Sequence, residues 1–85
     1  MDRLKRGQHL IAQLEELVVE VLMEAGRNNE LLGPAEINRR AGIWLPETVS
    51  TADRDWVGTG ILSALEAKGL VRKVEGTNGK RELTF

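Results

Sequence analysis

The strongest constraint on this chain is an apolar stripe that runs through its first third. Between residues 8 and 25, apolar side chains recur three and four residues apart, which is the pattern of one face of an α-helix. The stripe comprises Leu10, Ile11, Leu14, Leu17, Val18, Val21, Leu22 and Ala25. Gly26 and two asparagines follow it and favour a stop. The sequence therefore predicts a long amphipathic helix from Gln8 to Ala25, preceded by a flexible arm at residues 1–7.

A second, shorter helix is predicted from Pro34 to Ala41. Pro34 suits the first helical position because its missing N–H is not needed there. Glu36 then lies in the first turn, where a negative charge is favourable. Gly42 suits the left-handed position that follows a helix end.

A third helix is predicted from Ala52 to Lys68. Val57, Ile61 and Leu65 are four residues apart and are expected to face the core, with Leu62 widening this stripe. Trp56 is also expected in the core. The connection from Ile43 to Thr51 is interrupted by a proline, and three residues in it are expected to be able to cap the third helix: Thr48, Ser50 and Thr51.

The last part of the chain reads as a β-hairpin. The segments "LVRKV" and "RELTF" alternate in character, and Asn78-Gly79 between them is a strong turn signal because both residues tolerate positive φ. Leu31 and Leu32 are expected in a short extended segment. The predicted fold class is mainly α with a small β-hairpin (α+β), formed by a single domain over residues 1–85.

Composition excludes several classes of protein. The chain has 85 residues, which suffice for one small core. It has no cysteine, and His9 is its only histidine, so neither a cysteine-ligated zinc site nor a Ser-His triad within one chain is expected. We expect no enzyme activity and no cofactor. Acidic residues interrupt the apolar stretches and no signal-peptide pattern is present, so a cytoplasmic protein without membrane association is expected.

The order of the elements, helix, short extended segment, helix, helix and hairpin, resembles the winged helix-turn-helix superfamily over about residues 8–85. The matching stretches are "GPAEINRRAGI" in the place of the second helix and "VGTGILSALEAKGLVRKV" from the third helix into the first wing strand. The run Leu65, Lys68, Gly69, Leu70, Val71 is typical of bacterial members. The connection before the third helix is longer than the three or four residues common in that superfamily.

This resemblance implies binding to double-stranded DNA, as in a small bacterial or phage transcriptional regulator. The third helix would enter the major groove, and the hairpin would contact the DNA backbone. The net charge of the chain is −1, but basic residues concentrate near its end. The candidate DNA contacts are Arg39, Arg40, Arg54, Thr59, Ser63, Arg72, Lys73, Lys80 and Arg81.

A protein-binding adaptor with the same fold is the alternative function. Asp53, Asp55 and Glu66 belong to or adjoin the third helix, and their carboxylates would be repelled by phosphates. DNA binding predicts that the basic residues converge on one electropositive face. An adaptor predicts scattered charge and an exposed apolar patch. Gly58 and Gly60 weaken the third helix and indicate either a close approach to DNA or another helix, or irregular packing.

The wide apolar face of the first helix also predicts an interaction between copies. Part of that face belongs to the core of the domain. The remainder is expected to form a homodimer through Leu10, Leu14, Leu17 and Val21.

Overall fold

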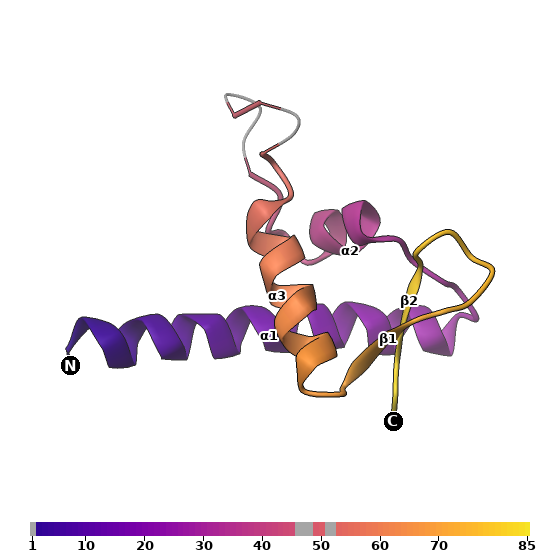
Figure 1. Cartoon of the computed structure of the whole chain (residues 1–85), viewed down its shortest axis with the longest axis horizontal. Helices are drawn as coiled ribbons and strands as arrows, with labels where there is room; N and C mark the ends of the chain where they lie inside the picture. The colour runs from indigo at the N-terminus through magenta and orange to yellow at the C-terminus, as the bar shows by residue number, and fades with distance from the viewer. Residues whose placement is uncertain (1, 46–48, 51–52) are drawn as a thin grey trace.

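The computed structural model describes residues 2–45, 49–50 and 53–85. Its elements follow the order α1 (Arg3–Arg27), α2 (Pro34–Arg40), α3 (Trp56–Ala67), β1 (Val71–Lys73) and β2 (Arg81–Leu83). Figure 1 shows α3 crossing the long helix α1, with α2 and the hairpin both lying toward the C-terminal end of α1. The predicted α+β fold class, with three helices and a C-terminal two-stranded hairpin, is confirmed.

Helix α1 begins at Arg3 rather than near Gln8. The Asp2 side chain accepts a hydrogen bond from the backbone N–H of Lys5 at 2.9 Å. This is an N-cap that satisfies one of the free N–H groups of the first turn. The segment predicted as a flexible arm therefore supplies the first turns of the helix, because a capping aspartate precedes it. None of the described helices is long and apolar enough to cross a membrane.

The core lies between the C-terminal half of α1, the other two helices and the hairpin. α1 contributes Val18, Leu22 and Ala25, and Leu32 packs with them from the segment before α2. The other buried apolar side chains of this cluster come from α2, the residue after it, α3 and β1: Ile37, Ala41, Ile61, Leu62, Leu65 and Val71. The core thus covers only part of the length of α1.

Helices α2 and α3 meet at a very close contact between Asn38 and Gly58. Asn38 is fully buried, and a Cβ atom at Gly58 would overlap its amide group. Gly60, by contrast, faces open space. Of the two explanations for Gly58, close approach to another helix is therefore the one observed, and the other helix is α2.

The inward face of α3 is confirmed at Ile61, Leu62 and Leu65 and differs from the predicted one at Val57 and Gly58. Gly58, Ile61, Leu62 and Leu65 are buried, whereas Val57 is exposed. Trp56, predicted in the core, is 70% exposed because it starts the helix on its outer side. Helix α3 begins at Trp56 with Asp55 as an N-cap whose side chain makes no capping bond. The predicted start at Ala52 and the capping candidates Thr48 and Thr51 lie outside the described residues, and Ser50 instead donates to Asp53 at 2.8 Å.

The hairpin has the predicted turn and a third, single-residue partner. β1 and β2 pair antiparallel, with Arg72 opposite Glu82 and Lys73 opposite Arg81. Asn78 and Gly79 have φ values of 61° and 90°, the left-handed conformation that the Asn-Gly signal predicts. Leu32 forms an isolated bridge with Arg81, so the extended segment before α2 lies along β2.

Candidate functional site

The outer face of α3 carries small and weakly polar side chains. Thr59, Gly60, Ser63 and Ala67 are exposed and lie on the side opposite the buried residues, and Trp56 begins the same side. Two of the predicted contacts, Thr59 and Ser63, are thus accessible one turn apart. Hydroxyl groups in these positions can donate to phosphate oxygens or to base edges.

The hairpin is held beside this face by an ion pair between β2 and α3. Arg81 Nε donates to Glu66 Oε1 at 2.7 Å, and Glu66 follows Ser63 by one helical turn. The guanidinium also donates to the carbonyl oxygen of Gly79, and only 12% of the Arg81 side chain is exposed. Arg81, predicted as a DNA contact, therefore connects the hairpin to the helix, and little of its charge reaches the surface.

The other basic residues of the hairpin differ in their partners. Arg72 forms a cross-strand ion pair with Glu82, with 2.7 Å between its Nη2 and Glu82 Oε2. Lys73 and Lys80 are exposed and have no carboxylate partner within the described part of the chain. Lys73 stands opposite Arg81 in the strand register, and the carbonyl of Lys80 accepts from Val74 at 2.8 Å. Both lysines are therefore close to Arg81 along the backbone, but their side chains leave opposite faces of the hairpin, because successive residues of a strand alternate.

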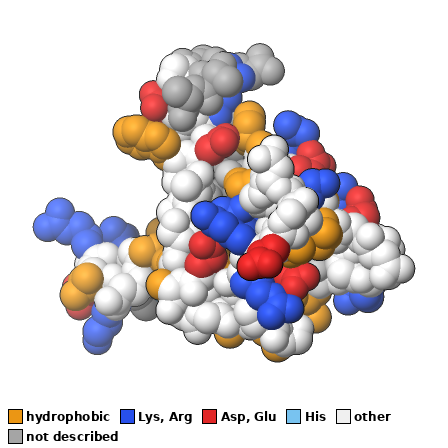
Figure 2. All heavy atoms as spheres, turned by 45° about the vertical axis from the view of Figure 1, so that its right-hand side comes forward, with side chains coloured by type: hydrophobic (Ala, Val, Ile, Leu, Met, Phe, Trp, Pro, Cys, Tyr) orange, Lys and Arg blue, Asp and Glu red, His pale blue; other side chains and the backbone are white. Residues whose placement is uncertain are grey.

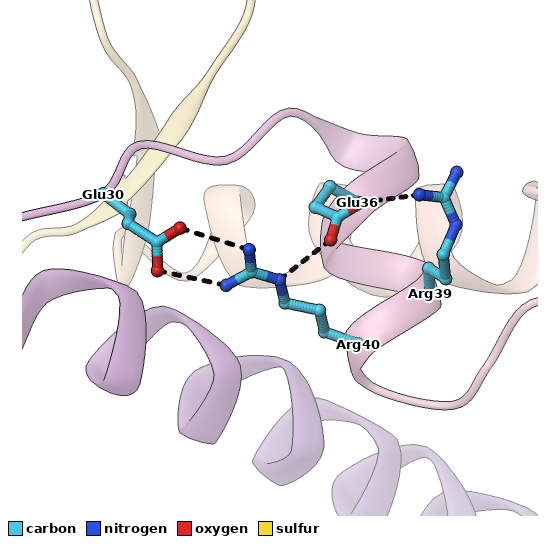
Figure 3. A network of polar contacts seen from close by, with 4 residues as sticks. All are labelled: Glu30, Glu36, Arg39 and Arg40. Atoms are coloured by element: carbon cyan, nitrogen blue, oxygen red, sulfur yellow. Dashed lines mark hydrogen bonds and ion pairs between the residues drawn. The ribbon is translucent and has the colours of Figure 1, made fainter. Parts of the chain in front are cut away.

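The two arginines at the end of α2 belong to a network of ion pairs, drawn in Figure 3. Arg40 donates to Glu36 at 2.9 Å and to both oxygens of Glu30 at 3.2 and 3.3 Å. Arg39 donates to the other oxygen of Glu36 at 2.6 Å, and its guanidinium lies 5.4 Å from the ring centre of Trp44. The network connects the segment before α2 to both ends of that helix.

The network shifts the protonation of its members. The hydrogen bond from Arg40, and then its positive charge, hold the pKa of the Glu30 carboxyl below its ordinary value of 4.5. The hydrogen bonds to Glu30 and Glu36 raise the pKa of Arg40. Both directions follow from an opposite charge at hydrogen-bonding distance. Arg39 and Arg40, predicted to contact phosphate, are therefore matched to carboxylates of the same chain.

Arg54 lies in the turn that leads into α3. Its Nε donates to the carbonyl oxygen of Val49 at 3.1 Å, and its own carbonyl accepts from the N–H of Leu45 at 3.2 Å. Arg54 is half-buried. These bonds hold together the two described sides of the long connection between α2 and α3.

The structure thus brings together only some of the nine predicted contacts. Thr59 and Ser63 are exposed on α3, and Lys73 and Lys80 are exposed on the hairpin that the Arg81–Glu66 ion pair joins to α3; we call these four residues the α3–hairpin surface. The arginines are engaged by carboxylates or backbone carbonyls. Figure 2 shows basic and acidic side chains interleaved across the face that it presents, not one continuous basic surface.

Sequence reasoning missed the acidic partners that occupy these arginines: Glu30, Glu36, Glu66 and Glu82. The ion pairs of two of these residues could have been predicted from sequence spacing. Glu36 and Arg40 are four residues apart on a helix, the spacing of a favourable ion pair. Glu82 lies opposite Arg72 once the hairpin register is counted outward from its turn. Glu30 and Glu66 meet their partners only through the tertiary fold.

A comparison of the chain with protein-family models, with curated proteins and with solved structures found no significant match.

Proposed function

We propose that the protein binds double-stranded DNA, with α3 in the major groove and the hairpin on the backbone, in the manner of a winged-helix regulator. The observation that supports it is the α3–hairpin surface. Thr59 and Ser63 are exposed one turn apart on α3, and the Arg81–Glu66 ion pair joins that helix to the hairpin, whose exposed Lys73 and Lys80 have no carboxylate partner among the described residues.

The mechanism assigns different roles to the two parts of this surface. Lys73 and Lys80 neutralise phosphates and supply affinity that does not depend on base sequence. Thr59 and Ser63 touch base edges or nearby phosphates. Gly60, where an added Cβ atom would meet open space, lets the helix backbone come close to the DNA. Binding is expected to be weak for one copy, because few cations take part.

The charge count sets the size of the salt effect. For B-DNA the slope of log K against log salt is about −0.9 for each neutralised phosphate, so two lysines predict a slope of about −2 per copy. If all seven predicted basic contacts took part, the slope would be about −6.

Fluorescence anisotropy with random duplex DNA over a range of salt concentrations tests this proposal. Lys73→Ala and Lys80→Ala should each weaken binding and reduce the slope by about 1. Lys5→Ala, which removes an exposed cation at the far end of α1, is the matched control and should leave both unchanged. Absence of binding at low salt, or an equal effect of the control, would refute DNA binding through this surface.

A protein-binding adaptor remains the second candidate, and one observation favours it. The outer face of α3 carries no charged side chain from Trp56 to Ala67 apart from Glu66, which Arg81 holds, and Trp56 at its start is 70% exposed. Exposed tryptophans are frequent centres of protein interfaces. In this case Trp56→Ala would abolish capture of the partner, whereas Lys73→Ala and Lys80→Ala would have little effect.

A further inference from the structure

The N-terminal half of α1 extends beyond the core of the domain. The buried residues of this 25-residue helix begin only at Glu15, and Figure 1 shows the N-terminal turns projecting past the other elements. Leu10 is 59% exposed and Ile11 is 48% exposed. The helix therefore presents apolar side chains in a region where no other element among the described residues covers them.

Along one side of α1, the side chains change in character from basic to apolar to acidic. Residues three or four apart along it run from basic through apolar to acidic, and we call them the α1 stripe: Arg3, Arg6, Leu10, Leu14, Leu17, Glu20 and Glu24. All are exposed except Leu14, which packs partly against the core. Val21 adjoins the acidic end and is likewise partly buried. The stripe is open along nearly the whole helix, about 37 Å in length at 1.5 Å per residue.

The charges of the stripe have no partners within the described ranges 2–45, 49–50 and 53–85. Arg3, Arg6, Glu20 and Glu24 take part in none of the ion pairs, which involve other residues of α1 and of the domain. Two such stripes are complementary in one orientation only. When the helices run antiparallel, the basic end of each meets the acidic end of the other and the leucines meet in the middle. When they run parallel, like charges face each other, which is unfavourable.

We propose that a second copy of this chain covers the α1 stripe, in an antiparallel pair of α1 helices. Leu10, Leu14 and Leu17 of the two copies form the apolar centre. Arg3 and Arg6 of each copy face Glu20 and Glu24 of the other. Such a contact is two-fold symmetric and therefore closes as a dimer. It requires no DNA, so it stands or falls separately from the proposed function.

Sedimentation equilibrium without DNA tests the surface. The wild type at tens of micromolar should have twice the 9.4 kDa mass of one chain. Leu10→Glu should raise the dissociation constant about a hundredfold, because each dimer loses two buried leucine side chains. Ile11→Glu is the matched control, since the next residue is also exposed and apolar but points away from the stripe, and it should remain dimeric. A monomeric wild type, or dissociation by Ile11→Glu and not by Leu10→Glu, would overturn the proposal.

Charge reversal tests the orientation. At low ionic strength, the Arg3→Glu, Arg6→Glu variant should have a dimer dissociation constant about tenfold higher or more than the wild type. The reason is that attraction becomes repulsion at both ends of the pair. Adding Glu20→Arg and Glu24→Arg to the same chain should restore the dimer. All four residues are exposed, so the fold should persist, and circular dichroism verifies this. A parallel pair would keep like charges opposed in every variant, so failure of the fourfold variant to recover would exclude the antiparallel arrangement.

Discussion

At the scale of single residues, the packing of α2 on α3 depends on the close approach of Asn38 to Gly58. Gly58→Ala should destabilise the protein by about 1–2 kcal/mol, because the new methyl group must displace a fully buried amide and overpacking outweighs the gain in helix propensity. Gly60→Ala in the same helix should instead stabilise it by up to about 1 kcal/mol, since nothing lies near its Cβ position. Urea unfolding of both variants measures the two effects.

The same contact contains an unusual polar group. Neither amide atom of Asn38 has a hydrogen-bond partner among the described residues. Asn38→Ala should therefore cost little, and it should remove the penalty of Gly58→Ala, so that the double variant is more stable than Gly58→Ala alone. Additive effects in this double-mutant cycle would show that the two residues do not share a contact.

At the scale of elements, the attachment of the hairpin depends on one arginine. Arg81→Met should destabilise the protein by about 1.5–3 kcal/mol, because it breaks a largely buried bond to Glu66 and leaves that carboxylate without its partner. Arg72→Met removes the exposed cross-strand pair with Glu82 and should cost about 0–1 kcal/mol. Thermal unfolding compares the two, and equal losses would contradict the different roles assigned here.

The anchoring of α2 should depend on pH. The pKa of Glu30 is lowered in the folded state, so the stability that it contributes is present above its ordinary pKa of 4.5 and is lost as the pH falls through its lower folded pKa. Arg40→Gln should therefore reduce stability at neutral pH, and the difference from wild type should shrink as the pH falls below 4.5. Chemical unfolding at several pH values tests this, and a difference that stays constant down to acid pH would refute it.

The elements themselves were predictable because they are specified locally. The period of the apolar residues predicts α1, and the Asn78-Gly79 turn predicts the hairpin. The positions that sequence reasoning placed wrongly depend on contacts between distant residues. Val57 is exposed and Gly58 buried because α2 brings Asn38 against α3. Arg81 was counted as a surface cation because only the tertiary fold brings Glu66 to it.

At the scale of the whole molecule, the antiparallel pair should make stability depend on concentration. A chain of 85 residues buries a limited core, so the proposed association should contribute a substantial part of its stability. The Tm of the wild type should rise with protein concentration, whereas that of Leu10→Glu should stay constant. The two should converge at low concentration, because Leu10 is exposed in a single copy and contributes little to the core. Differential scanning calorimetry over a wide concentration range measures this. A variant that unfolds at a lower temperature at every concentration would instead assign Leu10 to the stability of the monomer.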